Sequence, residues 1–251
     1  MAKLRLDQLL HERGLAESRT KAQALILAGS VFKGEQRLDK AGTMIDSDTA
    51  LEVRSPTSPY VSRGGLKLAH GLDHFALDPK DLVALDVGAS TGGFTDVLLK
   101  RGALRVYAVD VGHGQLDWRL RNDPQVVVLE KTNARYLTST EITEPVDLVV
   151  CDASFISLRL VLPAALALAK PEGRVIALIK PQFEVGKGEV GKGGVVRDHE
   201  LHRRVCADIA EWLGGVQGWT VDGIAESPIK GPKGNTEFLI GASRSSDVTK
   251  S

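Results

Sequence analysis

The stretch from Val83 to Leu99, VALDVGASTGGFTDVLL, places the strongest constraint on the fold of this chain. A short apolar run passes through a cluster of glycines into an amphipathic pattern, which predicts a strand, a tight loop and a helix. Glycines at 88, 92 and 93 allow sharp bends and the close approach of a ligand to main-chain N–H groups at the helix N-terminus. Nucleotide-binding α/β domains use this arrangement, so the stretch predicts a nucleotide-like ligand.

The glycine spacing disfavours a dinucleotide. Counted from Gly88, the G-x-G-x-x-G fingerprint needs a second glycine where this chain has Ser90. The remaining pattern, D-x-G-x-x-x-G-G from Asp86 to Gly93, resembles motif I of S-adenosylmethionine-dependent methyltransferases. An ordinary glycine-bearing turn is the alternative for this motif taken alone. The resemblance implies S-adenosyl-L-methionine as cofactor, bound by Asp86, Gly88, Ser90, Thr91, Gly92, Gly93 and Phe94.

From residue 82 onward, apolar strands alternate with helical segments. Continuous apolar strands of this kind predict a parallel sheet that is covered on both faces. The last two strand patterns, WTVDGIAESPI and NTEFLIGA, are joined by KGPKG without a helix, which predicts a closing antiparallel pair. The predicted fold class is therefore α/β, a Rossmann-like class I methyltransferase with a mostly parallel seven-stranded sheet, preceded by a small α+β domain.

The first 53 residues predict a separate small domain. Residues 5–13 form one expected helix, and a second runs from an N-cap at Ser18 to Gly29, with short strands after it. RLDQLLHERGLAESRTKAQALILAGSVFKG resembles the S4 RNA-binding module, although Lys33-Gly34 replaces the Asn-Gly often found in that family. A capping subdomain with solvated charges is the alternative. By position, the resemblance implies RNA contacts from Arg5, Arg19, Lys21 and Lys33.

Composition shifts set the expected domain boundaries. Two prolines and several hydroxyl residues in RSPTSPYVS, residues 54–62, are typical of a semi-rigid linker. The polar end SRSSDVTKS predicts a disordered tail. We expect an S4-like RNA-binding domain at 1–55, a linker at 56–63, an FtsJ-like methyltransferase domain at 64–242 and the tail at 243–251.

Polar residues follow or close five successive strands. Ligands of open α/β sheets collect at the carboxyl ends of the strands, so these side chains should converge on one crevice. Asp110 lies about 20 residues after the glycine turn, where such domains place a carboxylate on ribose hydroxyls. Asn133 is expected to hydrogen-bond the adenine edge, although asparagine is also common in turns. The five residues are Asp86, Asp110, Asn133, Asp152 and Lys180.

Asp152 and Lys180 carry the most chemical information. A lysine at the mouth of a buried strand must be paired, desolvated or functional. Methyl transfer to a ribose hydroxyl needs a proton acceptor, and a lysine of depressed pKa can serve. In this hypothesis Lys67 depresses the pKa of Lys180 by like-charge repulsion, Asp152 orients the ammonium and Glu237 holds the network. On spacing alone, however, Lys67 is predicted to be a surface lysine.

Those four residues resemble the Lys-Asp-Lys-Glu tetrad of the FtsJ-like ribose 2′-O-methyltransferases. A wider set of motifs is similar to the TlyA family, often labelled hemolysin A, over residues 3–242. The resemblance implies cytidine 2′-O-methylation of ribosomal RNA or a ribosomal subunit. A chain that starts at the first S4 helix resembles the shorter type and favours the large subunit. The further motifs are YVSRGGLKL, VDVGHGQL, CDASFIS, IKPQFEVGKGEVGKGGVV and NTEFL.

Further residues are candidates for contacts with RNA. Phe155 and Phe183 are candidates for stacking on the target base, and core packing is the equal alternative. EVGKGEVGKGGVVRD contains a near P-loop that lacks the magnesium-binding Ser or Thr, because position 193 is Gly. We expect a mobile lid there, with a solvated loop as the alternative. Candidate RNA contacts outside the small domain are Arg63, Lys187, Lys192 and Arg197.

Several function classes are disfavoured. Two cysteines without C-x-x-C spacing, and His199 and His202 expected on the surface, predict no metal site. No apolar run approaches about 20 residues and no signal-peptide h-region is present, so a cytoplasmic location without membrane contact is expected. No obligate protein partner is evident. The alternatives to an enzyme are an RNA-binding protein with a vestigial cofactor pocket and a membrane-acting hemolysin.

Overall fold

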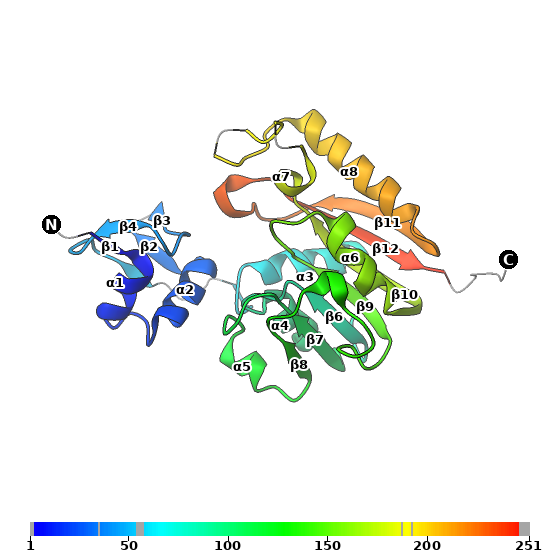
Figure 1. Ribbon diagram of the computed structural model, residues 1–251, viewed down its shortest axis with the longest axis horizontal. Helices are drawn as coiled ribbons and strands as arrows, with labels where there is room; N and C mark the ends of the chain where they lie inside the picture. The colour runs from blue at the N-terminus through cyan, green and yellow to red at the C-terminus, as the bar shows by residue number, and fades with distance from the viewer. Residues whose placement is uncertain (1–2, 35, 54–57, 187, 192, 246–251) are drawn as a thin grey trace.

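The computed structural model describes residues 3–34, 36–53, 58–186, 188–191 and 193–245. These residues form a small N-terminal domain and a larger α/β domain, arranged end to end, with helix α2 facing the larger domain (Figure 1). The described part of the chain contains no helix that is both long and apolar enough to cross a membrane.

The small domain consists of two helices and two small sheets. Ser18 caps the second helix, since its Oγ accepts the Lys21 N–H at 3.1 Å, and Gly29 with φ +74° follows the helix end, as expected. Leu6, Leu10 and Ile26 are among the side chains that fill the core. Its elements are β1 (Lys3–Arg5), α1 (Leu6–Glu12), α2 (Arg19–Leu27), β2 (Val31–Lys33), β3 (Gln36–Arg37), β4 (Met44–Asp46) and β5 (Glu52–Val53).

The larger domain is built on a seven-stranded sheet in the order β11-β12-β10-β9-β6-β7-β8. β12 pairs antiparallel with both β10 and β11, whereas the other pairs are parallel, which confirms the predicted fold class. The strands are β6 (Val83–Val87), β7 (Arg105–Val109), β8 (Val126–Leu129), β9 (Val146–Cys151), β10 (Ala169–Ile179), β11 (Trp219–Glu226) and β12 (Phe238–Arg244).

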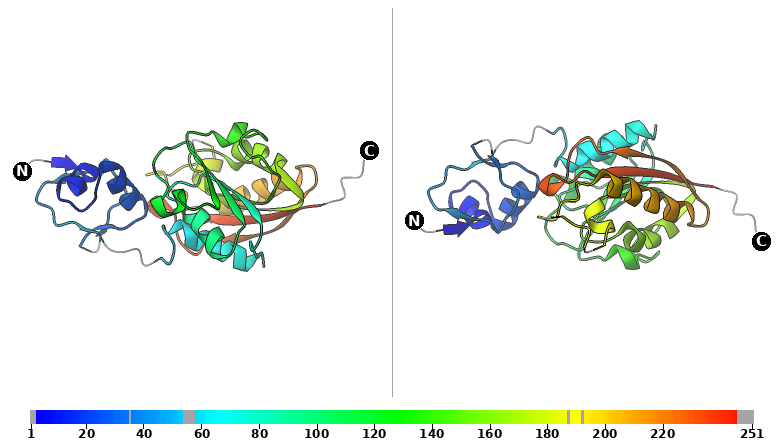
Figure 2. Two further views of the ribbon diagram at one scale, coloured as in Figure 1. Left: turned by 90° about the horizontal axis from the view of Figure 1, so that it is seen from below. Right: turned by 90° about the horizontal axis from the view of Figure 1, so that it is seen from above.

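Helices cover both faces of this sheet (Figure 2). Leu68 and Leu98 belong to the core on one face, and Leu162 and Ile209 belong to the core on the other. Neighbouring strand residues alternate between the two cores because successive side chains point to opposite faces. The helices are α3 (Gly64–His74), α4 (Gly93–Lys100), α5 (Trp118–Arg121), η1 (Ala134–Tyr136), α6 (Leu158–Ala167), α7 (Pro181–Glu184), α8 (His199–Gly214) and η2 (Pro232–Gly234).

Two predicted boundaries differ from the structure. The expected tail began at 243, but Ser243 pairs with Arg174 and Thr220, because β10 and β11 supply backbone partners on both sides of β12. The expected linker ran to 63, yet the Val61 N–H donates to Asp96 Oδ2 at 2.8 Å and Tyr60 lies against Gly65. Residues 58–63 therefore pack as part of the larger domain.

The glycine turn is shaped by packing within the chain. Gly88 and Gly92 have φ of +84° and +94°, as sharp bends require. A Cβ on Gly88 would lie 3.0 Å from Ala153 Cα, one on Gly92 would lie 2.3 Å from a Leu120 methyl, and one on Gly93 would lie 2.3 Å from a Ser62 hydroxyl. At their Cβ positions these glycines therefore make room for neighbouring segments of the chain. The approach of a ligand to their main-chain N–H groups stays a prediction.

Candidate active site

A cavity of about 890 Å³ lies at the carboxyl ends of the central strands. Asp110 after β7, Asn133 after β8 and Asp152 after β9 line it, together with apolar side chains such as Val111 and Ile156. The volume falls within the range typical of cofactor sites. The structure thus brings three of the five predicted strand-end residues to one cavity.

Asp110 also holds the glycine turn in place. Its carboxylate accepts the Ser90 N–H at 2.8 Å and the Gly112 N–H at 2.6 Å. Asn133 caps η1, because its Oδ1 accepts the Arg135 N–H at 3.2 Å. Both side chains are therefore held by hydrogen bonds to main-chain N–H groups at the cavity wall.

Asp86 does not line this cofactor-sized cavity. It lies inside β6 and is fully buried, and Thr95 Oγ1 donates to its Oδ2 at 2.6 Å. Burial raises the pKa of Asp86 to about 7, against the hydrogen bond from Thr95. Asp86 therefore does not reach the cavity where the cofactor contact was predicted. Its hydrogen bond with Thr95 connects α4 to β6, which is a structural role.

We expect Asp86→Asn to change how stability depends on pH. A carboxyl whose pKa is higher in the folded state contributes stability that is complete below pH ~4 and is lost as the pH rises through about 7. Relative to the wild type, the variant should gain on the order of 2 kcal/mol in unfolding free energy between pH 5 and pH 8. Urea unfolding at both pH values measures this gain, and Asp208→Asn on exposed α8 should show none.

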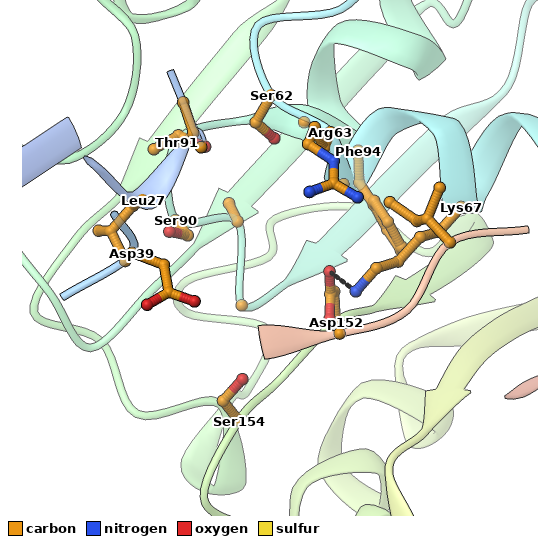
Figure 3. Close-up of a pocket in the computed structure, with 18 of the residues that line it drawn as sticks. Leu27, Asp39, Ser62, Arg63, Lys67, Ser90, Thr91, Phe94, Asp152 and Ser154 are labelled. Atoms are coloured by element: carbon orange, nitrogen blue, oxygen red, sulfur yellow. Dashed lines mark ion pairs between the residues drawn. The ribbon is translucent and has the colours of Figure 1, made fainter. Parts of the chain in front are cut away.

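The second cavity, of about 230 Å³, lies between the two domains and is lined by three members of the predicted tetrad, Lys67, Asp152 and Lys180. Figure 3 shows Lys67 and Asp152 in this cavity, which we call the tetrad cavity. Lys67 Nζ lies 2.6 Å from Glu237 Oε2 and 3.6 Å from Asp152 Oδ2. Lys180 Nζ lies 2.6 Å from Asp152 Oδ1. Asp152 therefore lies between two ammonium groups, and it lines both this cavity and the larger one.

The charges of this network are buried and paired. Lys67 is 7% exposed, Lys180 6% and Glu237 1%. Burial alone would lower the pKa of Lys67, but Asp152 and Glu237 outweigh it and raise that pKa. Burial alone would raise the pKa of Asp152, but Lys180 and Lys67 lower it. At neutral pH the structure therefore favours a charged Lys67 and an ionised Asp152.

The prediction from spacing that Lys67 lies on the surface is wrong. α3 approaches the sheet closely at Gly71, where a Cβ would lie 3.2 Å from Ile176 and 3.3 Å from Leu239. Lys67 is one turn earlier on the same face of the helix, so its side chain enters the domain instead of solvent. Glu237, directly before β12, meets it there.

Two further residues, which the sequence patterns did not indicate, support the site. Ser154 Oγ accepts a hydrogen bond from Lys180 Nζ at 2.8 Å. Asn235 Oδ1 accepts the Val196 N–H at 3.0 Å, and its Nδ2 donates to the Gly194 carbonyl at 3.0 Å. Both stand two residues from a tetrad member, in the CDASF and NTEFL motifs, which is the signal that could have identified them.

The predicted lid is partly fixed. Val195 and Val196 are buried, and Asn235 binds the backbone on either side. His202 was expected on the surface, but it is 4% exposed and its Nε2 lies 3.0 Å from the Val196 carbonyl oxygen. The C-terminal part of the loop is thus anchored, whereas Lys187 and Lys192 lie outside the described residues.

Phe155 is not a core residue. It is 90% exposed at φ +65°, and its ring centroid lies 5.1 Å from that of Phe183. Both rings line the larger cavity. The structure therefore removes core packing as the explanation for Phe155 and places an exposed aromatic pair beside the candidate cofactor site.

The predicted RNA contacts fall into separate groups. Arg5 Nε and Arg19 Nη2 both bind the buried Asp7 carboxylate, at 3.0 and 3.2 Å. The hydrogen bond from Arg5 is the main reason that the pKa of Asp7 lies far below its usual range. Lys21 lies instead in a gap between α2 and α5. Arg63 lines the tetrad cavity, and Lys33 and Arg197 are exposed.

The described residues include no group of three or more His, Cys, Asp or Glu side chains that could hold a metal ion. Cys151 is buried and Cys206 partly buried, and neither forms a disulfide. Burial raises the pKa of the Cys151 thiol to about 12. This thiol is therefore protonated at neutral pH and inert as a nucleophile.

The fold and site define a methyltransferase joined to an RNA-binding domain. The family model for FtsJ-like methyltransferases matches residues 60–244, and that for the S4 domain matches residues 4–50. A mostly parallel sheet with its antiparallel end strand, a cavity at the strand ends and the Lys–Asp–Lys–Glu network agree with that class.

Relatives that match most of this chain identify the family to which this methyltransferase belongs. The chain is 50% identical to the "16S/23S rRNA (cytidine-2'-O)-methyltransferase TlyA" of Mycobacterium tuberculosis, over 94% of this chain and 88% of that protein. It is 41% identical to "Hemolysin A" of Brachyspira hyodysenteriae, over 94% and 98%. A solved structure described as "Putative hemolysin from Streptococcus thermophilus" is 42% identical, with a TM-score of 0.75 over 98% of this chain and 90% of the other. The chain belongs to the TlyA family, as the sequence motifs predicted.

Proposed function

We propose that this protein transfers the methyl group of S-adenosyl-L-methionine to the 2′-oxygen of a cytidine in ribosomal RNA. The observation that carries the proposal is the position of Asp152, which pairs with Lys67 and Lys180 and lines both the cofactor-sized cavity and the cavity between the domains. A donor in the first cavity and a ribose in the second would therefore meet at the tetrad.

The residues of the larger cavity fit S-adenosyl-L-methionine, which supplies an activated methyl group on a sulfonium. Asp110 offers carboxylate oxygens for ribose hydroxyls, and Asn133 offers an amide for the adenine edge. Ser90 lines both cavities, while Thr91 and Phe94 line the smaller one at the glycine turn. Asp110, Asn133, Ser90 and the backbone of Gly88, Gly92 and Gly93 form the proposed cofactor site, and we extend it along the glycine turn to Thr91 and Phe94, since Ser90 lines both cavities.

The tetrad has a defined task in this proposal. Lys180 accepts the proton of the ribose 2′-hydroxyl, and Asp152 and Ser154 orient its ammonium at 2.6 and 2.8 Å. Lys67, kept charged by Asp152 and Glu237, lies beside the same Asp152 carboxylate that Lys180 contacts. Proton acceptance by Lys180 requires its amine form, because an ammonium cannot accept a proton.

We propose that the S4 domain binds the RNA substrate. Arg5 and Arg19 share the Asp7 carboxylate and remain 45% and 53% exposed, which lets their guanidinium groups reach phosphates. We include Lys21 and Lys33 of this domain, and Arg63 and Arg197 of the larger domain, in the RNA-contacting surface. We propose an RNA-binding domain at 1–55 and a catalytic domain at 58–244. The tuberculosis relative carries both 16S and 23S in its name; for this chain we propose large-subunit RNA as the main substrate.

Mapping of ribose methylation tests the proposal. Ribosomal RNA from cells without the gene, incubated with purified protein and labelled S-adenosyl-L-methionine, should gain one or a few 2′-O-methylcytidines, chiefly in the large subunit. RNA binding without any methyl transfer would instead favour an RNA-binding protein with a vestigial pocket. Leakage of liposomes at low protein concentration, without transfer, would favour the hemolysin activity that the Brachyspira protein is named for.

We expect Phe155→Ala to weaken use of RNA. An exposed ring beside Phe183 is suited to stacking on a base that has left its helix, and such stacking is worth about 1–3 kcal/mol per base. The value of kcat/KM for RNA should fall about 5-fold to 150-fold. Because Phe155 also lines the larger cavity, cofactor affinity is measured separately by calorimetry, and the fall is taken at saturating cofactor. Phe155→Trp, which keeps an aromatic face, is the matched control. Equal activity of the alanine variant would contradict a stacking role.

A further inference from the structure

The small domain contributes two charged side chains to the tetrad cavity. Arg37, from β3, and Asp39, just after it, line this cavity together with Lys67, Asp152 and Lys180. Figure 3 shows the Asp39 carboxylate on the side of the cavity opposite Lys67 and Asp152. Anything that enters between the domains to reach Lys180 therefore meets groups of the S4 domain as well.

The backbone fixes the position of Arg37. Residue 37 pairs with Phe32 in the β2–β3 ladder, and its stem lies on Gly29. A Cβ on Gly29 would be 3.3 Å from Arg37 Cδ and 3.5 Å from Arg63 Cδ, and its φ of +74° also favours glycine. Gly29 therefore provides the surface over which the two arginine stems enter the cavity from different domains.

Arg37 and Asp39 form a loose pair that leaves capacity for a ligand. Their nearest charged atoms, Arg37 Nη2 and Asp39 Oδ2, are 3.9 Å apart, which is longer than a charge-assisted hydrogen bond. The side chains are 31% and 37% exposed, so both groups are accessible from the cavity. A guanidinium beside a carboxylate presents adjacent donors and an acceptor to an incoming ligand.

This arrangement is complementary to one edge of cytosine. Cytosine presents an N4 amino donor next to the N3 and O2 acceptors, and a carboxylate is the usual partner of N4. Uracil replaces the amino group with O4, an acceptor that a carboxylate repels. Adenine also presents an amino group beside a ring nitrogen, so the pair separates cytosine from uracil more clearly than from adenine.

We propose that Arg37 and Asp39 of the S4 domain read the Watson–Crick edge of the target cytosine while its ribose lies at Lys180. Asp39 accepts from the N4 amino group, and Arg37 donates to N3 and O2. This inference rests on the proposed function, and it makes the small domain a determinant of base choice at the reacting nucleotide as well as a general RNA anchor.

Base-swapped substrates test the inference. Ribosomal RNA is prepared with the cytidine that the wild-type protein methylates, and in a second form with uridine at that position. Wild type should methylate the cytidine form strongly and the uridine form weakly. In Asp39→Asn, whose amide can donate to O4, we expect the ratio of cytidine to uridine rates to fall by about tenfold or more.

Two further variants keep the result interpretable. Asp48→Asn makes the same charge change at an exposed position of the same domain, outside the cavity, and should keep the wild-type ratio. Arg37→Lys keeps the charge but loses bidentate geometry, and it should also lower the ratio. If Asp39→Asn and Arg37→Lys both keep the wild-type ratio, the inference about Arg37 and Asp39 is wrong, while the proposed function stands. A wild-type protein that transfers no methyl to either RNA overturns the proposed function itself.

Discussion

Replacing Lys180 with methionine should abolish methyl transfer while the protein stays folded. Lys180 is the tetrad lysine that contacts Asp152 at 2.6 Å and Ser154 at 2.8 Å, and it is our proposed proton acceptor. Loss of a general base typically lowers the rate about 100-fold to 10 000-fold. Since Lys180 does not line the larger cavity, the affinity for S-adenosyl-L-methionine should not change.

Lys180→Arg separates charge from proton transfer. Arginine preserves the positive charge beside Asp152, but its pKa is too high for it to accept a proton at neutral pH. We therefore expect the arginine variant to be as inactive as the methionine variant. Rates come from labelled methyl transfer and cofactor affinity from calorimetry, with exposed Lys80→Met as the control. If either Lys180 variant kept more than a tenth of wild-type activity, the assigned role would be wrong.

The second large effect concerns stability. Glu237→Ala would leave the Lys67 ammonium buried with Asp152, 3.6 Å away, as its remaining partner in the tetrad. Removal of one member of a buried ion pair typically destabilises a protein by about 3–5 kcal/mol. We expect a loss of that size in denaturant unfolding of the larger domain, and loss of activity with it.

A double variant shows whether the unpaired charge of Lys67 causes the destabilisation expected for Glu237→Ala. When both members of a buried pair are replaced by apolar residues of similar volume, stability is often restored. Lys67→Met combined with Glu237→Leu should therefore be more stable than Glu237→Ala, although it remains inactive. Glu226→Ala, on an exposed position of β11, should stay within about 0.5 kcal/mol of wild type. Equal destabilisation of the single and double variants would indicate that Glu237 acts through packing instead.

The sheet could be predicted because its signals are local. Each strand is a continuous apolar run, and the joining segments carry helical periodicity or glycines, so strand order along the chain and the polar residues at the strand ends follow directly. Asp110, Asn133, Asp152 and Lys180 were identified in this way. Asp86 was not placed correctly, because one residue decides whether a side chain lies inside a strand or beyond its end.

The remaining features depend on contacts between distant segments. Burial of Lys67 requires the close approach of α3 at Gly71 and a partner 170 positions away. The burial of His202 arises from its contact with the Val196 backbone, which periodicity within α8 does not reveal. The shared cavity that contains Arg37 and Asp39 depends on how two domains meet, for which a single sequence has no local pattern.

The Lys67–Glu237 contact joins the first helix of the larger domain to the residue directly before its last strand. The proposed donor site is assembled from other segments, since the lining of its cavity within that domain lies between Val87 and Phe183. Local opening of β12 would therefore uncouple binding of the methyl donor from transfer of the methyl group. Such an opened protein would still capture the donor molecule but would lack the charge balance for transfer, so occupancy of the donor site by itself is no measure of competent enzyme.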